Sequence, residues 1–261
     1  MEYVQERFGQ GVDEVNILFT GDWHAGHPNY IEEIVDDALE TISSLPNGRI
    51  VLMGDLTEIA LTTTYGSTYE QVLTPEEQVD YVVEKLRPYK DIIVGAVAGN
   101  HNQRIVNAVG MNPMRLAFKI LGIEQKFFGY TGIIKWAFNK GCIHSRVWHG
   151  ATSSSRKMYI LKKIAEMREG FFSEICVMGH THRLLYSDDE FIRIPDSRNM
   201  KMKKVNLYEV SSGSALGWPE GYAEMKDLKE VKLGFPILKL TGDRADKKVQ
   251  ATKLEYIQDL V

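Results

Sequence analysis

Five short segments of the sequence place side chains that can bind metal ions directly after an apolar run. They are Gly21-Asp22-Trp23-His24, Gly54-Asp55, Gly99-Asn100-His101, Trp148-His149-Gly150 and Gly179-His180-Thr181-His182. The chain has seven histidines, and five of them fall in these segments. Neutral imidazoles, an amide oxygen and bridging carboxylates are donors that can hold two divalent ions about 3.5–4 Å apart for a hydrolytic reaction. None of the segments contains a cysteine, which argues against a structural zinc finger.

The spacing within the segments suits a shared site. Side chains alternate between two faces of an extended chain, so Asp22 and His24 point to the same side, and so do His180 and His182. The glycines allow the backbone to turn sharply where each apolar run ends. A single Asp-x-His pair or Gly-Asp turn is common in proteins that bind no metal. Only the combination of the five segments therefore predicts a metal centre.

Apolar runs and helical periodicity indicate the elements that must position these segments. Strands are predicted at residues 15–20, 50–53, 92–98, within 127–148, and at 175–178, 183–194, 204–210, 235–240 and 248–256. Helices are predicted at residues 29–42, 75–86, 103–121 and 156–168, with Pro113 as a candidate break in the third. Strands alternate with helices first and a more antiparallel half follows, which is typical of an α/β protein. Ligands of such sheets bind beyond the carboxyl ends of the strands, where the five segments lie.

The composition is that of an ordinary globular protein, with 44% hydrophobic and 25% charged residues in a chain of 261. We expect a single domain over residues 1–261, with an N-terminal tail to about residue 14. No apolar run reaches the roughly 18 residues of a membrane span, and the N-terminus lacks an apolar signal core. Cys142 and Cys176 read as buried reduced thiols, so a cytoplasmic location is expected. The net charge of −4 gives no general attraction to nucleic acid.

The five segments, in this order, resemble those of the calcineurin-like metallophosphoesterases, and the resemblance covers about residues 15–214. It implies a layered α/β-β-α sandwich in which mixed sheets are flanked by helices, and a pair of metal ions. By this similarity one ion is held by Asp22, His24 and His182, and Asp55 bridges it to the second ion. The resemblance assigns the remaining ligands of that second ion to Asn100, His149 and His180.

The resemblance implies a two-metal hydrolysis of phosphoester bonds in which a metal-bridging hydroxide attacks phosphorus. His101 is similar to the family histidine that protonates the leaving group. Glu58, three residues after Asp55, is expected to accept a hydrogen bond from His101 and fix its tautomer, although a Glu in an exposed loop is the other interpretation. Arg104 is a candidate for phosphate binding, or a surface arginine, and His27 is a candidate for the rim of the site.

Departures from the family pattern narrow the substrate. Protein phosphatases of the family carry a phosphate-gripping arginine directly after the acidic residue that Glu58 resembles, whereas Ile59 and Ala60 follow here. The residue after His101 is usually acidic and is Asn102 in this chain. The short core favours a phosphodiesterase, and Gly54-Asp55-Leu56 with its polar pair is loosely similar to the DNA-repair nuclease branch. A nuclease or nucleotide phosphodiesterase, a small-molecule phosphomonoesterase and an inactive metal-binding scaffold remain open.

The expected cofactor is a pair of divalent ions. Mixed nitrogen and oxygen ligands suit manganese, which we expect, and also Fe, Zn, Ni or Co. The expected partner is a phosphoester substrate, with nucleic acid or a nucleotide among the candidates, and no membrane. Neither the oligomeric state nor the natural substrate follows from the sequence.

Overall fold

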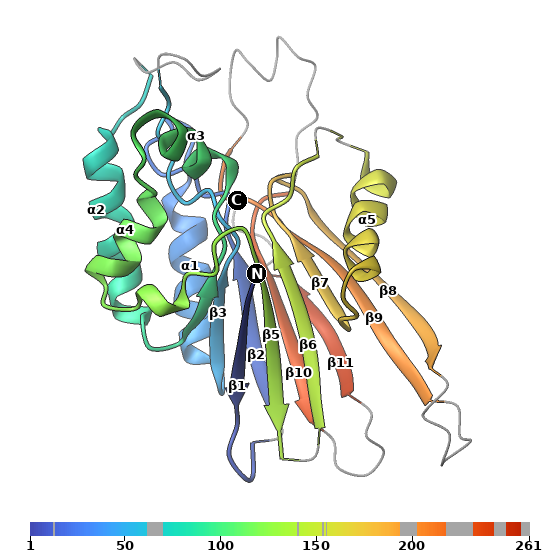
Figure 1. The fold of residues 1–261 in the computed structure, drawn as a ribbon. Helices are drawn as coiled ribbons and strands as arrows, with labels where there is room; N and C mark the ends of the chain where they lie inside the picture. The colour runs from blue at the N-terminus through green and yellow to red at the C-terminus, as the bar shows by residue number, and fades with distance from the viewer. Residues whose placement is uncertain are drawn as a thin grey trace.

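Two mixed β-sheets pack face to face in the computed structural model, and helices cover their outer faces (Figure 1). The structure describes residues 1–12, 14–61, 70–139, 141–152, 154, 156–193, 203–217, 232–242 and 249–256. Helices α1 to α4 lie against one sheet and α5 lies against the other (Figure 1). The predicted α/β-β-α sandwich is confirmed. No helix within these ranges is long and apolar enough to cross a membrane.

The first sheet has five strands in the order β11-β10-β2-β3-β4. Their bounds are Val249–Tyr256, Pro236–Gly242, Glu14–Thr20, Gly48–Leu52 and Ile93–Ala96. Strands β2, β3 and β4 are parallel, whereas β10 pairs antiparallel with β2 and with β11. The parallel arrangement brings the carboxyl ends of β2, β3 and β4 to one edge of the sheet.

The second sheet has six strands in the order β1-β5-β6-β7-β9-β8. Their bounds are Glu2–Arg7, Thr131–Phe138, Gly141–Trp148, Ile175–Met178, Lys203–Ser212 and Leu184–Arg193. Strands β6 and β7 are parallel to each other, so their carboxyl ends also share an edge. The helices are α1 (Glu32–Ser44), α2 (Pro75–Leu86), α3 (Asn100–Val109), α4 (Pro113–Ile120) and α5 (Lys157–Glu166).

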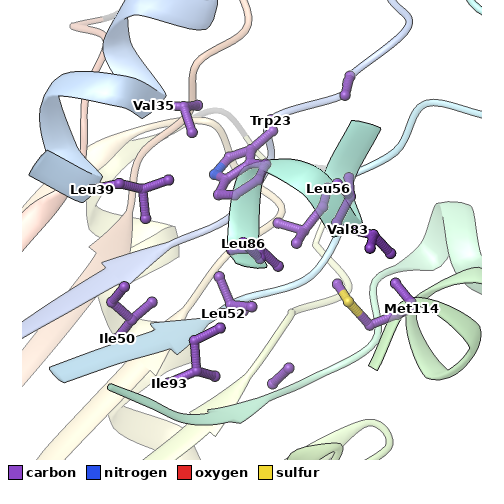
Figure 2. Close-up of a cluster of buried hydrophobic side chains, with 14 of the residues drawn as sticks. Trp23, Val35, Leu39, Ile50, Leu52, Leu56, Val83, Leu86, Ile93 and Met114 are labelled. Carbon is purple, nitrogen blue, oxygen red and sulfur yellow. The ribbon is translucent and has the colours of Figure 1, made fainter. Parts of the chain in front are cut away.

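Alternating side chains of the strands divide the interior into separate apolar cores. In β2, Ile17 and Phe19 belong to the core between the sheets, whereas Leu18 belongs to the core beneath the helices. Figure 2 shows part of the core beneath the helices, where Trp23 lies near Val35 and Leu39 of α1. A strand buried on both faces is continuously apolar, which is why residues 15–20 show no polar alternation.

Three sequence expectations are corrected by the structure. The N-terminal segment is not a tail, because residues 2–7 form β1, which pairs in parallel with β5. The helix predicted at 103–121 is two helices: α3 ends at the left-handed Gly110, and α4 begins with Pro113 in its first turn. Cys142 is exposed, whereas Cys176 is buried as expected.

Candidate metal centre

The five metal-competent segments converge at the paired carboxyl edges of the two sheets. Three of them follow β2, β3 and β4 of the five-stranded sheet, and two follow β6 and β7 of the six-stranded sheet. Backbone hydrogen bonds join neighbouring loops, with Asp22 N donating to Gly54 O at 2.9 Å and His24 N to Asp55 O at 3.1 Å. The site thus lies where the two sheets meet, rather than at the edge of a single sheet.

Trp23 anchors the loop that carries Asp22 and His24. Its side chain is fully buried in the core beneath the helices, and its indole N–H donates to Thr20 Oγ1 at 2.7 Å. Because the residue between them points into this core, Asp22 and His24 both turn toward the centre. The core drawn in Figure 2 therefore fixes the direction of two candidate ligands.

The backbone is strained at the candidate ligands. Positive φ angles, which non-glycine residues rarely adopt, occur at Asp22 (51°), His24 (55°), Asp55 (47°), His180 (67°) and His182 (53°). Such strain persists only where surrounding structure enforces it, and it concentrates at functional sites. Five of the seven non-glycine residues with positive φ in the described ranges are thus candidate ligands, and the other two are Asn47 and Ile59.

Two glycines leave room for the ligands. A Cβ atom on Gly99 would stand 1.9 Å from Asp55 Oδ1, and one on Gly54 would stand 2.7 Å from His149 Nδ1. Both distances are far below van der Waals contact, so a side chain at either position would displace Asp55 or His149. These glycines are therefore needed because the side chains of Asp55 and His149 lie against their backbone, in addition to the turns that the sequence predicts there.

Asp22, His24 and His182 form the first group of candidate ligands, and their donor atoms lie within 4.8 Å of one another. The two Nε2 atoms of His24 and His182 are 3.1 Å apart, and Asp22 Oδ1 is 3.5 Å from His182 Nε2. Asp22 Oδ2 accepts from His180 N at 2.8 Å, whereas Oδ1 is buried without a hydrogen-bond partner. A buried carboxylate oxygen that no protein donor satisfies fits a cation ligand.

Asp55, His149 and His180 form the second group, which also satisfies the 4.8 Å criterion. His149 Nδ1 lies 2.7 Å from Met53 O, and because a carbonyl only accepts, Nδ1 carries the proton. Nε2 therefore faces Asp55 Oδ2 and Asn100 Oδ1, each 3.0 Å away, and it offers a lone pair to them or to an ion only in the neutral ring. A nitrogen lone pair and two oxygens facing one another are a donor set for a divalent ion.

The electrostatics of the centre also favour bound cations. Burial lowers the pKa of His149, but the carboxylates of Asp55 and Asp22 outweigh it and raise the pKa to about 9. Burial opposes ionisation of Asp55 itself, yet the neighbouring His149 and His101 hold its pKa below the usual value. Two ionised carboxylates thus lie beside His149 Nε2, and a divalent ion that replaced the Nε2 proton would balance their charge. The residues present fit divalent ions.

Glu58 is buried, but its partner differs from the prediction. The carboxylate Oε2 accepts from His24 Nδ1 at 2.7 Å, whereas it lies 3.5 Å from His101 Nδ1. His101 Nδ1 instead lies 2.6 Å from the backbone oxygen of Glu58. Burial raises the pKa of Glu58, but the hydrogen bond and charge of His24 lower it to about 2. The expectation that the carboxylate orients His101 was wrong, because His24 lies closer and occupies it.

We predict that Glu58→Gln weakens metal binding more than it slows the chemical step. The amide oxygen of Gln still accepts from His24 Nδ1 but carries no charge, so the imidazole becomes a poorer ligand. The Mn²⁺ concentration for half-maximal activity should rise about 10–100-fold, with turnover at saturating Mn²⁺ nearly unchanged. Glu174→Gln, beside His144, is the matched control. A fall in turnover with an unchanged Mn²⁺ requirement would instead connect Glu58 to the reaction.

His101 belongs to neither of these two ligand groups, but with His24 and Glu58 it forms a third cluster whose donor atoms lie within 4.8 Å of one another. Its backbone N donates to Asp55 Oδ1 at 3.0 Å, and its ring packs edge-on against His24 with centroids 4.6 Å apart. Burial lowers the pKa of its imidazole to about 4, although Asp55 opposes the shift. Since Nδ1 donates to the Glu58 carbonyl, Nε2 is the ring atom that can meet a ligand.

The two candidate substrate residues flank the centre. Arg104 Nη1 lies 3.3 Å from His101 Nδ1, a contact rather than a hydrogen bond because both atoms are donors. Within the described ranges, no carboxylate comes within 4.0 Å of Arg104. His27 Nδ1 accepts from Asn29 N at 3.0 Å, so its Nε2 carries the proton of the neutral ring. Burial lowers the pKa of His27, and Glu58 opposes this shift.

Two residues that support the ligands were not predicted from the sequence. Asn102 Oδ1 accepts from Gly99 N at 2.9 Å and so caps α3, which begins with Asn100 and His101. Its position three residues after Gly99 is the spacing of a capping box, a signal that could have identified it. Ser214 Oγ donates to Asp22 O at 2.8 Å from 192 residues away, and no local pattern indicates that contact.

Comparison with known families agrees with this geometry. A family model described as calcineurin-like phosphoesterase matches residues 15–230, which include every candidate ligand. No individual curated protein matches the chain. The match covers most of the 261 residues. It agrees with the clusters of histidine and aspartate side chains that can bind metal. The chain therefore belongs to the calcineurin-like phosphoesterases, as the five segments predict, and is a metal-dependent phosphoester hydrolase.

Proposed function

We propose that the protein is a phosphodiesterase that works with two divalent ions, manganese in the native enzyme. The observation that supports this most is the meeting of two ligand groups, buried except for the half-buried His180 and His182, with the unpartnered Asp22 Oδ1 between His24, His182 and His149. Asp22 Oδ1 lies 4.0 Å from both His24 Nε2 and His149 Nε2, so it faces both groups.

In this proposal the chain divides its side chains between two ions. Asp22, His24 and His182 would hold one, Asn100, His149 and His180 would hold the other, and Asp55 would serve both. When bound, such a pair activates water as a nucleophile and stabilises the charge of the transition state. Asp55 also accepts a hydrogen bond from His101 N, and this bond fixes the position of the carboxylate relative to the backbone of His101.

His101 serves the leaving group. The negative phosphate of a bound substrate would favour protonation of His101 at Nε2 despite the burial of the ring. As the bond between phosphorus and the leaving oxygen breaks, that Nε2 proton moves to the leaving oxygen, and the neutral ring keeps its proton on Nδ1. Arg104, beside the same ring, binds a non-bridging phosphate oxygen. At the rim of the site, on the side of His24, His27 donates a hydrogen bond from Nε2 to the substrate.

The side chains after Glu58 favour a diester over a protein phosphomonoester. Ile59 and Ala60 are buried apolar residues, so no cation stands where the protein phosphatases of the family hold phosphate. A diester carries less negative charge than a monoester dianion and requires fewer cations. Arg104, with no carboxylate near it among the described residues, favours the second candidate, a small-molecule phosphomonoesterase.

Turnover of bis-p-nitrophenyl phosphate against p-nitrophenyl phosphate tests this choice. The protein is stripped with a chelator and reloaded with Mn²⁺, and both substrates are compared under the same conditions. We expect a clear preference for the diester, after which DNA, RNA and cyclic nucleotides are compared as natural substrates. A preference for the monoester would identify the second candidate. No turnover of either, with metal bound, would indicate a binding scaffold.

We further propose a cytoplasmic location. Both cysteines, Cys142 and Cys176, are free, which suits a reducing compartment. Fractionation of cells that express the protein tests the location, and recovery outside the cytoplasmic fraction would contradict it.

A further inference from the structure

Gln78 is a fully buried polar residue on α2 that the centre described above does not include. Its side-chain amide is satisfied on both sides. Oε1 accepts from Ile59 N at 2.8 Å, and Nε2 donates to Gln71 Oε1 and to Leu73 O, each at 2.9 Å. A buried amide with these partners is a fixed support rather than a solvated surface group.

The contact with Ile59 reaches the candidate acid His101 through a single peptide group. Ile59 N and the Glu58 carbonyl belong to the same peptide unit, and that carbonyl lies 2.6 Å from His101 Nδ1. In a trans peptide the N–H and C=O groups point in opposite directions. The hydrogen bonds therefore run in line, from His101 Nδ1–H to the Glu58 carbonyl and from Ile59 N–H to Gln78 Oε1. Each bond in such a chain polarises the next.

The peptide held in this way would not keep its orientation without support. Ile59 has a φ of 33°, a conformation that is costly for a β-branched residue. Gln71 fixes the following residue, since its Oε1 accepts from Ala60 N at 2.9 Å and its Nε2 donates to Ala60 O at 3.2 Å. The two glutamines thus hold consecutive backbone groups in a strained turn.

The loop after β2 also accommodates Gln78. A Cβ atom on Gly26, which has a φ of 96°, would stand 2.4 Å from Gln78 Cδ. Only a glycine at this position lets the amide lie against the loop that carries His24. The loop that carries Gly26 and the loop that carries Ile59 therefore both contact the Gln78 side chain and fix its position.

We infer that Gln78 is a positioning residue for His101, acting through the Glu58–Ile59 peptide. The inference rests on the proposed role of His101 as leaving-group acid. Among the described residues, the Gln78 side chain hydrogen-bonds to Ile59, Gln71 and Leu73 and to none of the candidate ligands. It holds the carbonyl that receives the Nδ1 proton, and so it directs Nε2 toward the leaving oxygen.

The test uses Gln78→Met, which keeps the side-chain length but removes the acceptor of Ile59 N. Turnover is measured on diphenyl phosphate and on bis-p-nitrophenyl phosphate, because the more basic phenolate depends more on a proton from His101. We expect turnover of diphenyl phosphate to fall about 10–100-fold, with a smaller loss for the nitrophenyl diester. Gln71→Met is the control for loosening of the turn. It removes one of the two acceptors of Gln78 Nε2, but it leaves Gln78 Oε1 on Ile59 N and Nε2 on Leu73 O. It should change the ratio of the two rates less than Gln78→Met does.

A double-mutant cycle with His101→Asn separates this inference from the proposed function. If Gln78 acts through His101, Gln78→Met should cause no further loss in the His101→Asn background. An equal loss in both backgrounds, or an equal loss for both leaving groups, would overturn the positioning role. Full activity of His101→Asn alone would overturn the proposed function instead. If Gln78→Met does not fold, Gln78→Asn carries the test, because its amide is one methylene shorter and no longer reaches Ile59 N, and it should lower turnover of diphenyl phosphate more than that of the nitrophenyl diester.

Discussion

Replacing His101 by Asn is expected to lower turnover of a phosphodiester by about 10²–10⁴-fold, the range typical of a lost general acid. Asn keeps the backbone N–H that donates to Asp55 Oδ1 at 3.0 Å, so the bridging carboxylate retains that partner. What disappears is the ring whose Nδ1 is held by the Glu58 carbonyl and whose Nε2 supplies the proton. The measurement is turnover of diphenyl phosphate in Mn²⁺-loaded protein.

The matched control for this variant is His144→Asn. His144 lies on β6, beside Glu174 at 3.5 Å, and precedes the end of that strand by several residues. It should leave turnover unchanged, and both variants should bind as much Mn²⁺ as the wild type. A His101→Asn protein with wild-type turnover of diphenyl phosphate would contradict the assignment of the leaving-group acid.

Replacing Asp22 by Asn is expected to abolish binding of the ion that His24 and His182 would share with it. Turnover should fall by at least about 10²-fold. A ligand should matter more than the residues that support ligands, whose loss commonly costs about 10–100-fold. Asp22 Oδ1 has no protein donor, while Oδ2 and the backbone oxygen are already bonded to His180 N and Ser214 Oγ. The substitution therefore removes the negative charge of Asp22 Oδ1, and no other protein group stands at that position to replace it.

Thermal unfolding with and without Mn²⁺ measures the loss separately from catalysis. An ion present at 100 times its dissociation constant stabilises the folded state by about 2.7 kcal/mol for each site. The wild type should gain this for two sites, and the Asp22→Asn protein should gain distinctly less. Asp188→Asn, on the exposed part of β8, should behave as the wild type. An Asp22→Asn protein with the full Mn²⁺-dependent gain would show that Asp22 binds no ion.

The ends of the strands could be predicted because local pattern determines them. Each of β2, β3 and β7 is a short apolar run that ends at a glycine followed by Asp or His, and such a run in a parallel sheet is buried on both faces. Parallel strands bring their carboxyl ends together, so the convergence of the ligands followed without knowledge of the strand order. That the ligands come from two sheets did not follow, because sheet partition depends on pairing between distant segments.

Contacts between distant segments account for the errors and omissions. Four of the six residues of β1 are charged or carry an amide, and the segment is a strand because β5, more than 120 residues away, offers an edge. The sequence predicts a contact of Glu58 with His101 because Glu58 stands three residues after the candidate ligand Asp55, whereas the tertiary fold brings His24 Nδ1 to 2.7 Å from the carboxylate. Gln78 looks like any polar residue in the first turns of a helix. Its role depends on the strained Ile59 and on the space left by Gly26.

The most direct test of the two-ion centre is a titration of metal-free protein with Mn²⁺, followed by electron paramagnetic resonance of the free aqueous ion. We expect the six-line signal of free Mn²⁺ to stay absent until two equivalents per chain have been added, because both ligand groups take up an ion. A free-ion signal that grows from the first addition would show that Asp22, Asp55 and their histidines bind no metal, and would contradict the account.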